Sequence, residues 1–389
     1  MAFLTSHTSH TSHTSHTSHT SHADDVSYSG LDASPLLAEG LIASQLGLDH
    51  WELDGQRRPI YANDLVDVRK GFPTDNKLDT VPKTRFFEME SGPRSYVCHA
   101  ELMSLMEVRP DPTDGSSAAK EVTLVYQGPG RLDLPLIKLM RPSYGLFKAQ
   151  VSLVHQMSKE RKERYAEILP QVYPAHAWWS QVVGLRPDKH RMTMEFLDAA
   201  LNFTCSTVFR LKQLFACPRP FEYTGMLQPL IQTPGHDSWP SGHATESFLI
   251  ASVLNSLALQ DTARAKVDTA LFDIARRIAE NREVAGVHFS VDSAAGRVLG
   301  DTLGRLVLWY AQGASASEKP KSRIFDPKKL YDDDKSPGAQ APMPNNVNDF
   351  DTAFGGDASA WPDHAAPVLS GQPYMQWLWE RAQEEWKWK

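Results

Sequence analysis

The sequence has no apolar segment long enough to cross a membrane. A membrane-spanning helix needs about 18 or more consecutive apolar residues, and the longest apolar stretches here, ESFLIASVLNSLALQ and GRLVLWYA, are shorter. A basic stretch followed by an apolar run is also missing at the N-terminus, so no signal peptide is recognisable. The sequence therefore predicts a soluble protein without an integral membrane span, and a cytoplasmic location by default.

Cysteine and net positive charge are also scarce. The 389 residues include only three cysteines, Cys98, Cys205 and Cys217, whose spacing matches neither a metal site nor a disulfide framework. We expect them to be reduced, packed thiols. The formal net charge is −7 at pH 7, and this excess of acidic residues argues against nucleic acid as a partner.

The N-terminal third of the chain is irregular in composition. Residues 1–22 include six Thr-Ser-His copies and predict a disordered tail, although six histidines at a spacing of three also suit chelation of a transition metal. Residues 23–145 are mixed and interrupted by Gly, Pro and Asp, with strand-like pieces at 95–108 and 120–126. We expect this region to pack on the core of the protein.

The remainder of the chain predicts a mainly α fold. Residues 146–313 are expected to form a helical bundle, because apolar residues recur at helical spacing in several long segments. These segments are 144–173, 190–216, 244–259, 262–284 and 290–312. Residues 314–389 contain a linker that is poor in aliphatic side chains, and then a Trp-rich helix. This helix docks either on the body of the protein or on another subunit, so a homo-oligomer stays open.

Three short segments of the helical region carry residues suited to chemistry. In the first, Lys212 stands seven residues before Arg219, and Pro218 and Pro220 end the helix that carries Lys212. Two helical turns separate seven residues, so both cations can project to one side. In the second, Pro-Ser-Gly-His at 240–243 precedes a helix that we expect to be buried. The start of a buried helix does not require a histidine.

The third segment, NREVAGVHFSVD, contains Arg282, His288 and Asp292. His288 and Asp292 are four residues apart, so we expect them on one helix face, with Asp292 accepting a hydrogen bond from the His288 ring. That bond would fix the ring tautomer and leave the other nitrogen free as a nucleophile or a metal ligand. Gly286 is expected to end the helix that carries Arg282.

Together the three segments predict an oxyanion site. Lys212, Arg219 and Arg282 supply three positive charges and donors that match an oxyanion. Ser241 adds a hydroxyl, and the helix start at Gly242 offers backbone N–H groups that bind anions. Singly, a lone arginine is usually a surface residue and a lone helix histidine is usually a core residue. The ordered set of three motifs argues against coincidence.

The three segments resemble the signature of the type-2 phosphatidic-acid phosphatase and vanadium-dependent haloperoxidase superfamily. The family pattern is K-x6-RP, PSGH and SR-x5-H-x3-D, and the match runs from Lys212 to Asp292. One position departs from it, because Asn281 precedes Arg282 where the family commonly has serine. The resemblance implies a helical bundle of the acid phosphatase and vanadium haloperoxidase type.

The resemblance also implies two chemistries on one scaffold. In the phosphatases, the residue matching His288 attacks phosphorus to form a phosphohistidine, and the one matching His243 protonates the leaving alkoxide. In the haloperoxidases, His288 would be the metal ligand of vanadate, His243 the acid–base partner of hydrogen peroxide, and Lys212 the group that polarises bound peroxide. His236 resembles the second histidine of haloperoxidases that prefer bromide or iodide; alternatively, it is a solvated loop histidine beside Asp237.

These features favour a vanadium-dependent haloperoxidase that oxidises bromide or iodide, rather than chloride, with hydrogen peroxide. Its partners would be hydrogen peroxide, halide and a small organic substrate. The residues expected to bind the vanadate cofactor are Lys212, Arg219, Ser241, Gly242, His243, Arg282 and His288. One alternative is a soluble phosphomonoesterase that uses the same site, and a second is a non-catalytic oxyanion-binding protein, which would need only the basic residues.

Overall fold

The structure is a computed structural model, which describes residues 86, 89–111, 118–128, 132–172, 176–258, 265–316, 319–330 and 373–387. The predicted tail at 1–22, most of the predicted irregular region before residue 86, and the predicted linker between 331 and 372 lie outside the described residues. Among the described residues, the chain divides into two compact units after Arg94. The unit that begins at Ser95 contains the sheet and the long helices.

Most of the described chain after residue 143 is helical. The helices are α6 (Tyr144–Met157), η5 (Ser158–Glu160), α7 (Arg161–Ile168), η6 (Pro170–Val172), α8 (His176–Val183), α9 (Arg191–Phe215), α10 (Pro220–Tyr223), α11 (Gly242–Ala258), α12 (Ala265–Val284), α13 (Ser290–Gln312), η8 (Gly313–Ser315), α14 (Pro327–Leu330) and α16 (Tyr374–Glu385). The predicted mainly α fold is confirmed. None of the described helices is long and apolar enough to span a membrane.

A small sheet accompanies the helices, with its strands in the order β1–β2–β3–β4. The strands are β1 (Met106–Pro110), β2 (Glu121–Gly128), β3 (Leu132–Met140) and β4 (Arg323–Phe325). The first three are antiparallel neighbours, whereas β4 pairs in parallel with β3. The predicted strand at 120–126 is confirmed by β2.

The predicted strand at 95–108 is wrong over most of its length, because α5 (Ser91–Ser104) is a helix. Cys98, Glu101, Leu102 and Leu105 are buried. This spacing of three or four residues is typical of a helix face. Only the end of the segment, from Met106, joins the sheet as part of β1.

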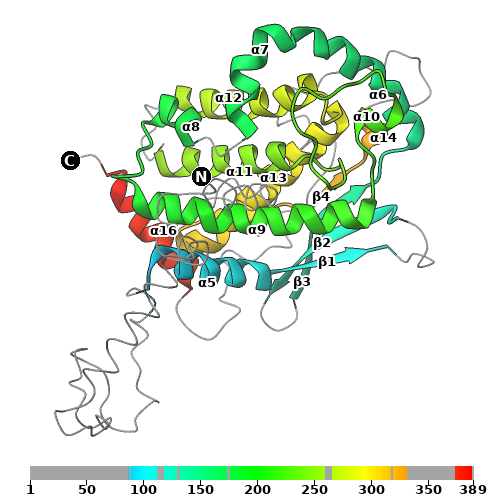
Figure 1. Ribbon diagram of the computed structural model, residues 1–389. Coiled ribbons are helices and arrows are strands. Elements are labelled where there is room, and N and C mark those ends of the chain that lie inside the picture. The colour runs from blue at the N-terminus through cyan, green and yellow to red at the C-terminus, as the bar shows by residue number, and fades with distance from the viewer. Residues whose placement is uncertain are drawn as a thin grey trace, which may run out of the picture. The chain divides into compact units, whose positions relative to one another are not determined.

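α11 lies in the middle of the bundle, where it packs against α9, α12 and α13 (Figure 1). Its contact with α13 is especially close. A Cβ atom added at Gly296 would stand 2.6 Å from the carbonyl oxygen of Ser241, and one added at Gly300 would stand 2.2 Å from that of Thr245. Only glycine allows two helix backbones to approach so closely. This contact brings the first turn of α11 next to the first turn of α13.

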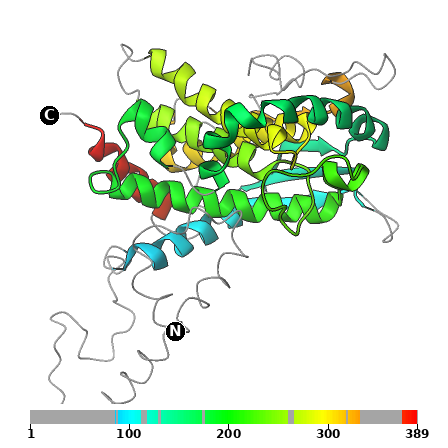
Figure 2. The same cartoon turned by 45° about the horizontal axis from the view of Figure 1, so that its top comes forward.

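α16 docks on the body of the protein, beside the N-terminal part of α9 (Figures 1 and 2). The buried Glu101 carboxylate accepts hydrogen bonds from the first backbone N–H groups of α16, at Tyr374 and Met375. At the other end, the Glu385 carboxylate accepts from the backbone N–H groups of Met192 and Thr193, in the first turn of α9. Each helix therefore relies on a distant carboxylate to cap its N-terminus.

Tryptophan side chains complete this docking. The Trp386 ring stacks on His190, with 4.4 Å between the ring centroids, and its Nε1 donates to the Thr193 hydroxyl at 2.9 Å. Trp379 packs against Phe196, with 5.3 Å between ring centroids. Of the two docking alternatives left open by the sequence, the structure shows the contact with the body of the protein.

Candidate active site

Lys212 lies in the last turn of α9, which ends where Ala216 adopts a left-handed conformation with φ of 47°. The ammonium donates to the carbonyl oxygens of Asp237 and Ser238, at 2.8 and 2.6 Å. Burial, followed by the charge of Arg219, lowers the pKa of Lys212 well below its ordinary value. Lys212 therefore braces the loop before α11, and it is not among the residues that line the pocket described below.

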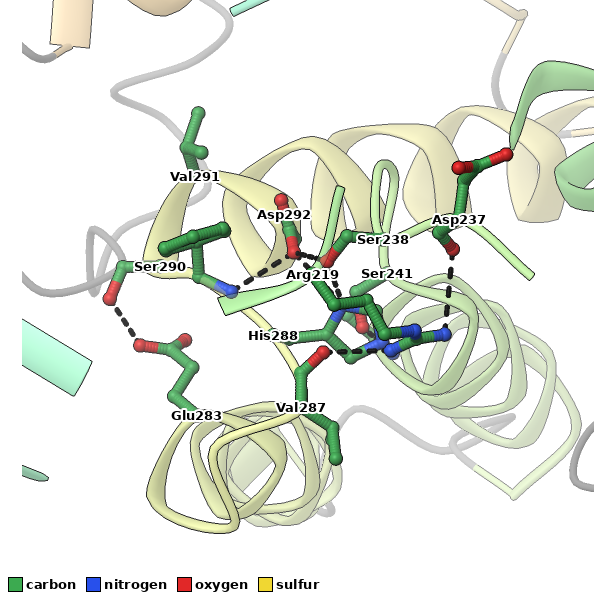
Figure 3. Close-up of polar contacts among 12 residues, drawn as sticks. Arg219, Asp237, Ser238, Ser241, Glu283, Val287, His288, Ser290, Val291 and Asp292 are labelled. Atoms are coloured by element: carbon green, nitrogen blue, oxygen red, sulfur yellow. Dashed lines mark hydrogen bonds and ion pairs between the residues drawn. The ribbon is translucent and has the colours of Figure 1, made fainter. Parts of the chain in front are cut away.

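The Arg219 guanidinium makes its hydrogen bonds to backbone carbonyl groups and to the ring of His236. Nη1 donates to the Val287 carbonyl at 2.7 Å (Figure 3). Nε donates to the His236 carbonyl at 2.9 Å, and Nη2 contacts His236 Nδ1 at 3.2 Å. Burial lowers the pKa of Arg219 to about 10, so the group stays charged at neutral pH. Because these bonds go to neutral groups, the positive charge of Arg219 is left to act on the pocket.

The Pro-Ser-Gly-His turn sets the start of α11. Ser241 is fully buried; its backbone N–H donates to the Asp292 carbonyl at 3.0 Å, and its hydroxyl lies 3.4 Å from the Ala244 backbone nitrogen, in position to cap α11. Gly242 and His243 line the pocket, whereas Ser241 does not. Ser241 therefore contacts the start of the helix and does not form part of the pocket wall.

Arg282, in the last turn of α12, is the least satisfied cation of the site. Its Nη2 donates to the Ile168 carbonyl at 2.9 Å and to Gln171 Oε1 at 3.4 Å. Its Nε and Nη1 are buried and have no hydrogen-bond partner among the described residues. Burial lowers the pKa of Arg282 to about 9, which keeps it charged at neutral pH. Arg282 lines the pocket with two unused donors.

His288 and Asp292 are paired, but not on one helix face as the spacing predicted. Gly286, with φ of +82°, turns the chain after α12 as predicted, and His288 then lies in the loop before α13 begins at Ser290. Asp292 stands in the first turn of α13, where its Oδ2 accepts from the Phe289 backbone N–H at 2.9 Å and contacts His288 Nδ1 at 3.0 Å. The pair is formed by helix-capping geometry.

The protonation states of this pair follow from burial and charge. Burial raises the pKa of Asp292 to about 6, so its carboxylate is ionised at neutral pH and can only accept hydrogen bonds. Burial, together with the charges of Arg219 and Lys212, lowers the pKa of His288 well below its ordinary value. The neutral ring therefore carries its proton on Nδ1, toward Asp292, and keeps a lone pair on Nε2.

Six of the predicted site residues line one pocket, with an empty volume of about 390 Å³ that includes open solvent. They are Arg219, His236, Gly242, His243, Arg282 and His288. The remaining wall consists of Val172, Ile231, Gln232, Pro234 and Val287. Lys212, Ser241 and Asp292 are not part of the lining. Among the described residues, no group of three or more His, Cys, Asp or Glu side chains is placed to hold a metal ion.

Ser238 is a member of the site that the sequence motifs do not indicate. Its hydroxyl donates to Asp292 Oδ2 at 2.5 Å and lies 3.3 Å from His288 Nδ1 (Figure 3). The only signal in the sequence is its place between His236 and the Pro-Ser-Gly-His turn. A single serine in a loop carries no periodic pattern, so its role depends on the fold.

Comparison with known proteins agrees with this arrangement. Residues 196–315 match the model of the PAP2 superfamily, a segment that contains α11 to α13, most of α9 and every predicted site residue. No curated protein matches the chain. Members of this superfamily are generally enzymes, either phosphatases or haloperoxidases. The match supports membership of the PAP2 superfamily for residues 196–315, which carry both histidines and all three basic residues in the family order.

Proposed function

We propose that the pocket binds a tetrahedral oxyanion and that the chain is a vanadium-dependent haloperoxidase oxidising bromide or iodide with hydrogen peroxide. The observation that carries the oxyanion site is Arg282, whose buried Nε and Nη1 have no partner among the described residues. A buried donor left unsatisfied costs about 1–3 kcal/mol, and more when it is charged. An oxyanion in the pocket would supply an acceptor to this unsatisfied guanidinium.

The residues present fit a bound vanadate. Arg219 and Arg282 stand in the pocket wall as cations, and the backbone at Gly242 belongs to the N-terminus of α11, where anions bind favourably. The Nε2 lone pair of neutral His288 is the one ligand that vanadate would require from the chain. When bound, vanadate supplies the centre that activates hydrogen peroxide toward attack by halide.

The chain's own residues would hold charge and move protons. Arg219 and Arg282 bind the negative oxygens, and Asp292 orients the His288 ring through Nδ1. His243, at the start of α11, lines the same pocket and is the group that would exchange protons with the reacting oxygen. General acid–base catalysis of this kind typically contributes about 10²- to 10⁴-fold in rate.

Two observations favour the haloperoxidase. His236 lines the pocket and its Nδ1 lies 3.2 Å from Arg219 Nη2, so it can influence the halide as the resemblance suggested. The rest of the pocket wall consists mainly of apolar side chains. Among them, Val287 belongs to a buried apolar cluster against which Ile231 packs. Such a wall suits a polarisable halide or an uncharged organic substrate better than a second charged group.

A phosphomonoesterase is the second candidate, and Lys212 favours it. The haloperoxidase role expected for Lys212 requires its ammonium to reach bound peroxide, yet this ammonium is tied to two carbonyl oxygens. A phosphatase needs only the pocket residues. His288 Nε2 would attack phosphorus while His243 gives its proton to the departing alkoxide. His243 would then take a proton from the water that hydrolyses the phosphohistidine.

The test compares three proteins: the original chain, His243→Ala and His288→Ala. Each is assayed for vanadate- and peroxide-dependent bromination, for hydrolysis of p-nitrophenyl phosphate, and for vanadate binding by calorimetry. We expect bromination by the original chain. His243→Ala should lose about 10²- to 10⁴-fold in rate but still bind vanadate, whereas His288→Ala should lose both tight binding and activity.

His155→Ala serves as the matched control, because His155 is an exposed histidine of α6 that is not in the pocket lining. Phosphate-ester hydrolysis without bromination would select the phosphatase. Vanadate binding with neither activity would leave a non-catalytic oxyanion-binding protein. Loss of binding in His243→Ala with retention in His288→Ala would refute the roles assigned to the two histidines.

A further inference from the structure

A line of side-chain amides connects a surface ion pair to Arg282. Asn281 Nδ2 donates to Glu167 Oε2 at 3.0 Å and to Gln171 Oε1 at 2.8 Å. The same Gln171 oxygen accepts from Arg282 Nη2 at 3.4 Å. Asn281 is fully buried and Gln171 is 3% exposed. Neither amide has a part in the chemistry described above, yet both are placed next to the cation with unused donors.

The direction of each amide in this line is fixed by its neighbours. The paired guanidinium of Arg277, which donates to both Glu167 oxygens, lowers the pKa of that carboxyl to about 2. An ionised carboxylate can only accept, so Asn281 must turn its NH₂ group toward Glu167. Arg164 Nη1 lies 3.3 Å from Asn281 Oδ1, which supports the same orientation. The second N–H of Asn281 is then left for the oxygen of Gln171.

The orientation of Gln171 decides what Arg282 meets. The Gln171 oxygen that accepts from Asn281 is also the atom that faces Arg282 Nη2. In the opposite orientation the Gln171 NH₂ group would face Arg282, and two donors would repel each other. The Ile168 carbonyl holds the same Nη2 atom at 2.9 Å. A guanidinium is planar and rigid, so fixing one corner restricts its plane and therefore the direction of Nε and Nη1.

We propose that Gln171 is a positioning residue for Arg282, and that Asn281 acts through Gln171 by holding its amide oxygen toward the guanidinium. This inference rests on the proposed oxyanion site. A serine at position 281, as the family commonly has, carries one hydroxyl donor on a shorter side chain. It would be unable to donate to Glu167 and Gln171 together, so this chain has its own means of orienting Arg282.

The first test measures binding of inorganic phosphate to the full chain by calorimetry. Gln171→Leu removes the acceptor at similar side-chain size, and we expect its affinity for phosphate to fall about 10- to 100-fold, as for other supports of a binding group. Gln312→Leu is the matched control, because Gln312 makes a tertiary hydrogen bond to Ser256 and lies outside the pocket lining. Its phosphate affinity should equal that of the original chain.

The second test separates positioning from a general effect on folding. If Asn281 acts through Gln171, then Asn281→Ser should weaken phosphate binding in the original chain but add nothing in the Gln171→Leu background. Residues with independent roles would give additive losses. Thermal melting of each variant confirms that the protein compared is folded.

The outcomes distinguish this inference from the proposed function. If the original chain does not bind phosphate or vanadate, the oxyanion site itself is wrong. If the original chain binds and Gln171→Leu binds equally well, the site stands and the positioning role of Gln171 is refuted. Additive losses in the double variant would overturn the part assigned to Asn281.

Discussion

Replacing Gly300 with alanine should separate α11 from α13 and thereby disrupt the pocket. The added Cβ would stand 2.2 Å from the Thr245 carbonyl oxygen, whereas ordinary contacts begin near 3.4 Å, so the two helices must move apart by about 1.2 Å. The neighbouring atom is backbone, which cannot rotate away as a side chain can. His243 stands at the start of α11 and His288 just before α13, so the shift changes the distance between them.

Two magnitudes follow from this displacement. Overpacking in a core typically costs about 1–3 kcal/mol of the free energy of unfolding. A misplacement of about 1 Å at a reacting group can cost on the order of 10²-fold in rate. We therefore expect Gly300→Ala to melt at a lower temperature and to lose about 10²-fold in kcat/KM for whichever reaction the chain catalyses, measured by thermal melting and by the assays above.

Gly145→Ala is the control for the substitution itself. Gly145 is exposed in the first turn of α6, and its added Cβ meets only the Ser143 hydroxyl, at 3.7 Å. Alanine there should raise stability, by up to about 1 kcal/mol, because alanine favours a helix over glycine. A Gly300→Ala protein as stable and active as the original chain would show that the helix contact does not hold the pocket in place.

Three further outcomes are expected. Burial raises the pKa of Glu283 from 4.5 to about 7, so the folded state holds a proton that the unfolded state has lost; stability falls by about 3 kcal/mol as pH rises through this window. Glu283→Gln should therefore melt higher than the original chain at pH 8 and alike at pH 4.5. Ser238→Ala removes a hydrogen bond that lowers the pKa of Asp292, so the acidic limb of the kcat/KM pH profile should move to higher pH. Glu385→Ala removes the cap of α9 and should cost about 1–2 kcal/mol in urea unfolding; an unchanged unfolding midpoint would contradict that role.

The sequence predicted the parts of the molecule that depend on local pattern. Apolar spacing predicted α9 and α13 almost to the residue, because both are long and carry apolar residues at helical spacing. The motifs predicted which residues would form the oxyanion site: three basic side chains and two histidines. Six of the predicted site residues line one pocket, because the start of α11, the end of α12 and the loops before α10, α11 and α13 meet there.

The remaining features depend on contacts between distant segments. β3 pairs with β4 across more than 180 residues, and no local pattern indicates that pairing. Lys212 was expected in the pocket, but its ammonium instead donates to the carbonyl groups of residues 237 and 238. The spacing of His288 and Asp292 predicted their contact correctly and its geometry wrongly, because a residue at N3 of a helix can reach back to the residue before the helix cap.

The docking of α16 has a consequence for the order in which the chain folds. Thr193 and Glu385 are 192 residues apart, so α9 leaves the ribosome long before the carboxylate that caps its first turn has been made. Until then the first N–H groups of α9 must bind water, and the end of the helix nearest His190 frays. The nascent protein can assemble the pocket from α9, α11, α12 and α13, but it gains full resistance to local opening only when α16 arrives. Through Glu385, the stability of an early helix therefore depends on a helix that is made late.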